Sequence, residues 1–294
     1  MRLGALEAGG TKMVCAIGDE HGNVFERESF PTCKPEETMP NIINYFKDKD
    51  IEALGVGSFG PLNLDENDPH YGDITTTPKL AWANYPLRSE LIKALGVPVG
   101  IDTDVNAAAL SEARIGAGKG VDSLVYYTIG TGVGGGAMIG GKLVHGLVHP
   151  EMGHMLLRPV EGDPTPKGFC PYHDGCLEGM ANGPAIEKRW GVSAKELPPE
   201  HPAWDIEAEY LAQMCVNTIV MMSPKKIVLG GGVMHQLHLF PKIHKRTKEL
   251  LNGYVAHKDI LEDIENYIVP PALGDNAGAA GSLLLALEAL EAAK

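Results

Sequence analysis

The stretch Thr128-Ile129-Gly130-Thr131-Gly132-Val133-Gly134-Gly135-Gly136 follows the apolar run Leu124-Val125-Tyr126-Tyr127. Glycine-rich backbone at the end of a strand lets main-chain N–H groups approach an anion closely, so it predicts a phosphate-binding loop or a tight turn. The residues that follow, Ala137-Met138-Ile139 and then Gly140-Gly141, indicate a second strand ending in a hairpin turn. A Rossmann G-x-G-x-x-G loop must open a helix instead, and no G-x-x-x-x-G-K-[ST] loop occurs, so both of these nucleotide sites are excluded.

The same strand, glycine turn and strand occur near the start of the chain, over residues 3–17 with the turn at Gly9-Gly10-Thr11. A third glycine run, Gly230-Gly231-Gly232, follows the apolar residues 227–229. A single glycine turn is weak evidence, because turns need glycine in any case. Two glycine hairpins at matching points of the two halves, with a third glycine run, favour a duplicated fold that holds a polyphosphate from both sides.

Length and composition limit the class of protein. The chain has 294 residues, of which 44% are hydrophobic, which is enough for a full core and two domains. Its net charge of −13, without a Lys/Arg-rich run, argues against nucleic acid or an anionic membrane as a partner. No apolar stretch follows Met1, no run of about 18 apolar residues occurs, and the five cysteines do not form a disulfide pattern. We therefore expect a cytoplasmic protein.

Hydrophobic periodicity predicts the same order of elements twice. In the first half we expect strands at residues 2–8, 13–17, 24–30, 54–57 and 97–101, and helices at 35–46, 87–95 and 107–113. In the second half we expect strands near 123–129, 135–140, 142–145, 227–229 and 267–269, and helices near 207–221, 242–251 and 276–291. The repeated order β-β-β-α-β-α is the plan of a duplicated actin-like, ribonuclease-H-like α/β ATPase fold with a cleft between two domains.

The domain boundary is predicted near the glycine-rich residues 116–120. Residues 1–116 would form an N-terminal domain and residues 117–275 a C-terminal domain with an inserted loop at 150–180. The last helix, 276–291, is expected to pack back on the N-terminal domain.

Polar residues follow two of the predicted strands. Asp102-Thr103-Asp104-Val105-Asn106 lies at the end of the strand at 97–101, where α/β sheets bind ligands. One aspartate could simply cap the next helix, but two aspartates and an asparagine make Asp104 a candidate for catalysis or ligand binding. The long polar segment 65–79 also favours a functional loop, since loops of this length are otherwise disordered.

A metal site is predicted in the inserted loop. Cys170-Pro171-Tyr172-His173-Asp174-Gly175-Cys176 has the spacing C-x₂-H-x₂-C, and His154 is a nearby fourth ligand. Four such ligands close a tetrahedral zinc site, which would hold the loop in shape and leave no position to activate water. The alternative is two ordinary thiols among surface histidines. The clustering of cysteine beside histidine favours the metal.

Six ordered motifs resemble those of the ROK sugar kinases, and most of all the fructokinase branch of that family. They are Glu7-Ala8-Gly9-Gly10-Thr11-Lys12, Ile74-Thr75-Thr76-Thr77-Pro78-Lys79, Asp102-Thr103-Asp104-Val105-Asn106, Gly130-Thr131-Gly132-Val133-Gly134-Gly135, Pro150-Glu151-Met152-Gly153-His154 and Gly175-Cys176-Leu177-Glu178-Gly179. The resemblance covers essentially the whole chain. It implies a kinase that uses ATP and Mg²⁺ to phosphorylate a hexose, most closely fructose, at its 6-hydroxyl, with a structural zinc ion and usually as a homodimer.

The resemblance also implies roles by position. Asp104 would be the general base that takes the proton of the sugar hydroxyl. Contacts to ATP would come from Gly9, Gly10, Thr11, Lys12, Gly130, Thr131, Gly132, Gly183, Gly231, Gly232, Val233 and Met234. Contacts to the sugar would come from Gly60, Pro61, Thr103, Asp104, Glu151, His154 and Glu178, and zinc would be held by His154, Cys170, His173 and Cys176.

Three positions depart from the family pattern. Glu7 stands where many relatives have Asp, which leaves its role toward Mg²⁺ open. His173 replaces a thiol of the zinc loop, and Thr103 replaces an Asn before the base. The loss of an amide that could bond a pyranose hydroxyl is compatible with fructose in place of glucose. The DNA-binding module of the family's repressors is not expected, because the first predicted strand begins at residue 2.

Three other functions are compatible with parts of the sequence. A kinase for mannose, glucose or an amino sugar would use the same machinery. A sugar sensor without catalysis would bind hexose and report to a partner, but the candidate base and both glycine hairpins argue against it. An ATPase of the actin or chaperone type would hydrolyse ATP without sugar, and the predicted zinc loop argues against that.

Overall fold

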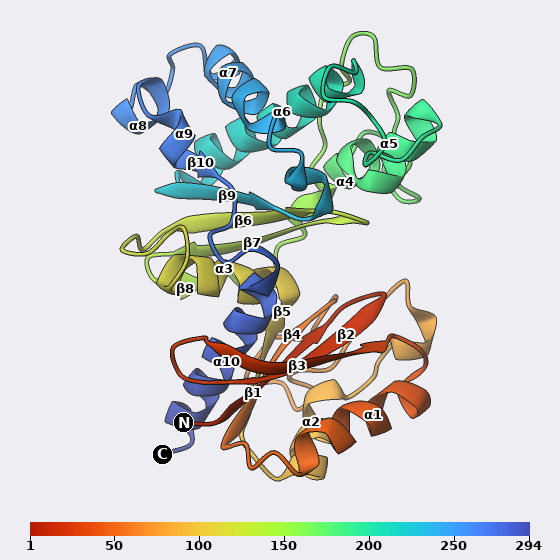
Figure 1. Cartoon of the computed structure of the whole chain (residues 1–294), viewed down its shortest axis with the longest axis vertical. Helices are drawn as coiled ribbons and strands as arrows, with labels where there is room; N and C mark the ends of the chain where they lie inside the picture. Colours follow the sequence, from red (N-terminus) through yellow and green to blue (C-terminus); the bar gives the residue numbers. More distant parts are fainter.

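The repeated order of elements folds into the same mixed sheet twice (Figure 1). The computed structural model describes all residues, 1–294. One five-stranded sheet has the order β3-β2-β1-β4-β5, and the other has the order β10-β9-β6-β7-β8. When the first sheet is read from β3 and the second from β8, each has the third, second, first, fourth and fifth strands of its half side by side. The predicted duplicated actin-like fold is confirmed.

The first half contains the elements that periodicity predicts, with bounds shifted by at most a few residues. Its strands are β1 Leu3–Ala8, β2 Lys12–Gly18, β3 Val24–Pro31, β4 Ala53–Ser58 and β5 Val99–Thr103. Its helices are α1 Pro35–Lys47, η1 Leu80–Trp82, α2 Leu87–Leu95 and α3 Asp104–Arg114. Helix α1 begins with a proline, whose fixed φ suits the first helical turn, and α2 ends at Gly96 with φ of 67°, a conformation that glycine adopts freely.

The second half adds short helices to the repeated plan. Its strands are β6 Leu124–Ile129, β7 Val133–Ile139, β8 Lys142–Leu143, β9 Lys226–Gly230 and β10 Ile268–Val269. Its predicted helices are α6 Ala203–Met222, α7 Leu239–Leu251 and α10 Ala277–Ala292. Periodicity did not predict η1 in the first half, nor η2 Met152–His154, α4 Leu177–Ala181, α5 Gly183–Trp190, η3 Gly232–His235, α8 Lys258–Leu261, α9 Ile264–Tyr267 and η4 Gly274–Asn276 in the second. No helix in either half has the length and apolar composition needed to span a membrane.

Helices α3 and α10 lie between the two sheets and pack against each other (Figure 1). Helix α10 covers β1, β4 and β5 of the first sheet, whereas α3 covers β6 and β7 of the second. Small residues make these approaches close: a Cβ at Gly281 would lie 1.8 Å from the Ala107 carbonyl oxygen. The C-terminal end of the chain thus packs on the N-terminal sheet. The boundary near residue 116 stays a prediction.

The contact between β4 and α10 gives a stability prediction. A Cβ at Gly55 would lie 1.7 Å from the Ser282 carbonyl oxygen and 2.6 Å from the Ala286 nitrogen. Because both atoms belong to the backbone, Gly55→Ala should push the helix from the sheet and lower the free energy of unfolding by about 1–3 kcal/mol or more. Chemical denaturation would measure it, with Gly146→Ala as the control, since its nearest contact is 3.5 Å. Equal midpoints for the two variants would contradict this packing.

Candidate active site

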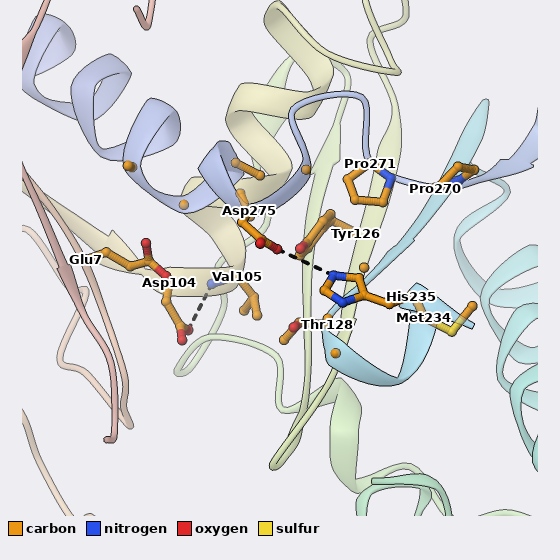
Figure 2. Close-up of a pocket in the computed structure, with 18 of the residues that line it drawn as sticks. Glu7, Asp104, Val105, Tyr126, Thr128, Met234, His235, Pro270, Pro271 and Asp275 are labelled. Atoms are coloured by element: carbon orange, nitrogen blue, oxygen red, sulfur yellow. Dashed lines mark hydrogen bonds and ion pairs between the residues drawn. The ribbon is translucent and has the colours of Figure 1, made fainter. Parts of the chain in front are cut away.

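A cavity of about 510 Å³ opens beside α3 and α10, between the two sheets (Figure 2). Figure 2 shows the Glu7 and Asp104 carboxylates on one side and Tyr126, Thr128 and Met234 on the other. Five of the residues predicted to contact ATP or act as base line it: Lys12, Asp104, Gly231, Gly232 and Met234. The cavity therefore joins the predicted base to the predicted nucleotide segment of the other half.

Strand register explains why the glycine turn and the predicted base share one edge of the first sheet. Strands β1, β4 and β5 are parallel neighbours, and Ala8 pairs with Ser58, which in turn pairs with Thr103. The residues that follow, Gly9, Phe59 and Asp104, leave the sheet side by side. Since neighbouring strands lie about 4.8 Å apart, the β1–β2 turn and Asp104 are separated by roughly two strand spacings.

Asp104 is the first residue of α3 and is partly buried. Its Oδ1 accepts a hydrogen bond of 2.9 Å from the Val105 N–H. The pKa of Asp104 is raised to about 7, chiefly by burial and then by the negative charges of Glu7 and Glu151, while the Val105 N–H lowers it. A carboxylate with a pKa near neutrality is suited to accept and release a proton at physiological pH.

Asp102 is held quite differently from Asp104. Its Oδ1 accepts hydrogen bonds from the Thr103 N–H at 2.7 Å and the Asn106 amide at 2.8 Å. Its Oδ2 lies 2.7 Å from Nε2 of His145, and this bond raises the pKa of the histidine. Asp102 is buried with every oxygen partnered. Asp102 therefore stabilises the β5–α3 junction, whereas Asp104 lines the cavity.

Thr103 joins this junction as a cap. Its Oγ1 accepts the Asn106 N–H at 3.1 Å and so caps the N-terminus of helix α3. The side chain predicted to contact sugar thus has a structural role. Thr103 is buried, with 4% of its surface exposed. Its hydroxyl hydrogen and one oxygen lone pair are left for a ligand.

The two glycine turns are each closed and braced by neighbours. In the first, the Gly9 N–H donates to the Lys12 carbonyl at 3.1 Å, and Thr32 Oγ1 donates to the Gly9 carbonyl at 2.7 Å. Thr11 and Lys12 are exposed at this turn. These hydrogen bonds hold the backbone of the turn and leave the side chains of Thr11 and Lys12 accessible to a ligand.

The second turn, between β6 and β7, has the Gly130 N–H donating to the Gly132 carbonyl at 2.8 Å. The Gly183 N–H donates to the Gly130 carbonyl at 2.8 Å, and Oε2 of Glu178 accepts the Val133 N–H at 3.0 Å. The structure thus brings together Gly130, Gly132, Gly183 and Glu178, and leaves Thr131 exposed. The side chains of Val233 and Met234 both lie in the core of the second half, and of the two only Met234 also lines the cavity.

His149 connects the segments predicted to contact sugar, although no motif of the sequence identifies it as a site residue. Its Nε2 accepts the Leu62 N–H at 3.0 Å, next to Gly60 and Pro61, and its Nδ1 lies 3.6 Å from a carboxylate oxygen of Glu151. The side chain is 5% exposed. Its only signal in the sequence is that it precedes Glu151 by two residues.

The four predicted zinc ligands converge. The ligand atoms of His154, Cys170, His173 and Cys176 all lie within 4.8 Å of one another. Nδ1 of His154 is 3.6 Å from Cys176 Sγ and 3.9 Å from Cys170 Sγ, and Nδ1 of His173 is 3.6 Å from Cys170 Sγ. Two thiolates and two imidazoles at these separations fit a tetrahedral zinc ion, whose ligand bonds are about 2.0–2.3 Å. With Nδ1 facing the thiols, His154 has only Nε2 for a sugar hydroxyl.

Comparisons with known proteins agree with the resemblance. The model of the ROK family matches residues 3–289. A fructokinase from Pediococcus pentosaceus is 47% identical over 99% of this chain and 99% of its own length. A fructokinase from Zymomonas mobilis is 44% identical over 97% of this chain and 96% of its own. The crystal structure of a ROK hexokinase from Thermus thermophilus has a TM-score of 0.79 and 27% identity, covering 99% of this chain and all of that one.

Proposed function

This chain belongs to the ROK family, and we propose that it transfers a phosphoryl group from ATP to fructose. The main support is the identity of 44–47% to fructokinases over nearly the full length of both chains. The geometry agrees, because Asp104, whose pKa is raised to about 7, lies at the sheet edge that carries the first glycine turn. The enzyme is thus an ATP-dependent fructokinase, and we propose the 6-hydroxyl as the acceptor.

Fructose would lie between the loop of Gly60 and Pro61 and the segment of Glu151 and His154. These two segments belong to different halves, and His149 already bonds to one and approaches the other. Hydrogen bonds from both sides would hold the acceptor hydroxyl beside Asp104. Such orientation removes much of the entropic barrier to transfer.

Asp104 would take the proton of the hydroxyl as the oxygen attacks phosphorus. The two glycine turns would hold the triphosphate through backbone N–H groups, from opposite sides of the cleft. Mg²⁺ bound with ATP would neutralise phosphate charge, and Glu7, a carboxylate in the wall of the cavity, is suited to hold it. Positioning and charge neutralisation thus account for most of what the protein must supply.

We also propose a structural zinc ion at the Cys₂His₂ cluster. It would fix the loop that leads into α4 and so set the place of Glu178 against the second glycine turn. From the family resemblance we propose a homodimer. The net charge of −13 and the free cysteines support a cytoplasmic enzyme with small-molecule substrates and no nucleic acid or membrane partner.

The function is tested by ADP release from ATP and Mg²⁺ with fructose, mannose, glucose, N-acetylmannosamine or no sugar. Release that depends on fructose would support the proposal. Preference for another hexose would keep the mechanism and change the substrate. ADP release without sugar would indicate an ATPase, and sugar binding without any release would indicate a sensor.

The raised pKa of Asp104 predicts the pH dependence of turnover. Below a pH of about 7 the carboxyl is protonated and cannot accept the hydroxyl proton, so kcat/KM for fructose should fall as the pH drops through about 7. Above that pH the base is ionised and the profile should level off. Initial rates with saturating ATP would measure it. A rate independent of pH between about 5 and 8 would rule out a base with this pKa.

A further inference from the structure

Lys79 lies over the glycine turn that joins β1 and β2. Its Cε is 3.0 Å, and its Nζ 3.9 Å, from the place that a Cβ of Gly10 would occupy. Lys12, on the same turn, lines the 510 Å³ cavity, and Lys79 does not. Two lysines therefore flank one glycine turn, and only Lys12 reaches the nucleotide side.

The segment that carries Lys79 is anchored at both ends. At its start, the N–H and Oγ1 of Thr75 both donate to the Pro61 carbonyl, at 2.8 and 3.0 Å. At its end, Trp82 is 1% exposed and its indole N–H donates to the Cys33 carbonyl at 2.8 Å. Between them, Oγ1 of Thr77 accepts the Lys79 N–H at 3.3 Å. This run therefore leads from the proposed sugar loop to the phosphate turn.

The charge of Lys79 is not balanced within the protein. The side chain is partly buried and forms no ion pair, although the chain carries a net charge of −13. Placing a partly buried cation without a counter-ion costs free energy that a bound anion would offset. Its neighbours are the first glycine turn and, through Thr75, the loop of Gly60 and Pro61. The first segment is proposed to bind phosphate and the second to bind sugar. An anion held between them would therefore be the phosphoryl group that passes from ATP to the sugar.

We propose that Lys79 is a catalytic residue whose ammonium contacts the phosphoryl group during its transfer. The inference rests on the proposed function. The bond from the γ-phosphorus to the bridging oxygen of ADP breaks, a bond from phosphorus to O6 of fructose forms, and the O6 proton passes to Asp104. Lys79 gains and loses no proton. It attracts the negative charge on the non-bridging oxygens, which it would also contact in the fructose 6-phosphate product.

The test compares Lys79→Met and Lys79→Arg with Lys93→Met, a lysine of the same half with 80% of its side chain exposed. For Lys79→Met we expect kcat to fall by about 10²–10³-fold, the usual cost of one lost charge-stabilising donor. Inhibition by fructose 6-phosphate should weaken at least about tenfold, because the product keeps the phosphoryl contact. The KM for fructose should change little. Lys79→Arg should recover part of kcat, and Lys93→Met should match the wild type.

Each outcome decides the role of Lys79. Normal kcat in Lys79→Met would overturn it, and so would a raised fructose KM with unchanged product inhibition, because that pattern describes a residue that only shapes the loop. Melting temperatures would identify misfolding, and Lys79→Arg keeps the test valid if Lys79→Met does not fold. If the wild type prefers another hexose, the same comparison is made with that sugar. A wild type inactive with every sugar removes the proposed function and this role with it.

Discussion

Asp104→Asn is expected to lower kcat for fructose phosphorylation by about 10²–10⁴-fold. The amide has nearly the shape of the carboxyl, and its oxygen can still accept the Val105 N–H that Oδ1 of Asp104 accepts at 2.9 Å. It cannot take a proton from the sugar hydroxyl. The variant should therefore bind ATP and fructose normally and fail at the chemical step, which single-turnover measurements would separate from binding.

The pKa of Asp104 also predicts how this variant affects stability. A carboxyl whose pKa rises from its ordinary value to about 7 on folding binds its proton more tightly in the folded state. Its ionisation therefore destabilises the fold as the pH rises from about 4 through 7, and the full cost is present above 7. Asp104→Asn removes that charge, so its melting temperature at pH 8 should equal or exceed that of the wild type. Thermal unfolding at about pH 5 and pH 8 would measure the difference.

The matched control for this experiment is Asp122→Asn, an exposed aspartate paired with Lys225 at 2.8 Å. It should leave kcat unchanged. Near-normal turnover in Asp104→Asn would remove Asp104 from its role as base. A loss of turnover together with a lower melting temperature would indicate damage to the fold instead.

Local signals were sufficient to predict the duplicated sheets from the sequence. Apolar runs ending in glycine turns identify the hairpins β1–β2 and β6–β7, and the repeated order of elements indicates the duplicated fold. The order of the strands within each sheet is seen only in the structure. The helices that were missed depend on contacts across the fold. Helix α4 begins where Cys176 Sγ accepts the Gly179 N–H, and this cysteine is one of the four side chains that converge as candidate metal ligands. No periodicity in five residues could have predicted it.

The segments of the candidate site could be predicted from the sequence, but the different roles of neighbouring residues within one segment could not. Asp102 and Asp104 follow the same strand and look alike in sequence. Only the fold shows that His145 and Asn106 occupy the oxygens of Asp102. His149 was missed for the same reason, since its hydrogen bond joins it to Leu62, 87 residues earlier in the chain. Hydrogen bonds between segments far apart in the chain cannot be predicted from the spacing of residues within one segment.

Cys176→Ser is expected to abolish zinc binding and to raise the KM for fructose by roughly 10–100-fold. Cys176 is fully buried and supplies one of the two thiols of the cluster. It also caps helix α4, whose Glu178 accepts the Val133 N–H at 3.0 Å beside the second glycine turn. A serine hydroxyl is a poor zinc ligand, so the loop should loosen and Glu178 lose its fixed position. Metal analysis should find about one zinc per wild-type chain and none in the variant.

Cys33→Ser is the control, because Cys33 is an exposed free cysteine outside the cluster. It should keep both the metal and the fructose KM of the wild type. Wild-type protein purified without chelators and found free of metal would contradict the zinc site itself. Cys176→Ser that loses zinc but keeps the wild-type KM would instead separate the metal from the sugar site. That result would mean that the hydrogen bond of Glu178 to the Val133 N–H is enough to position it without the metal.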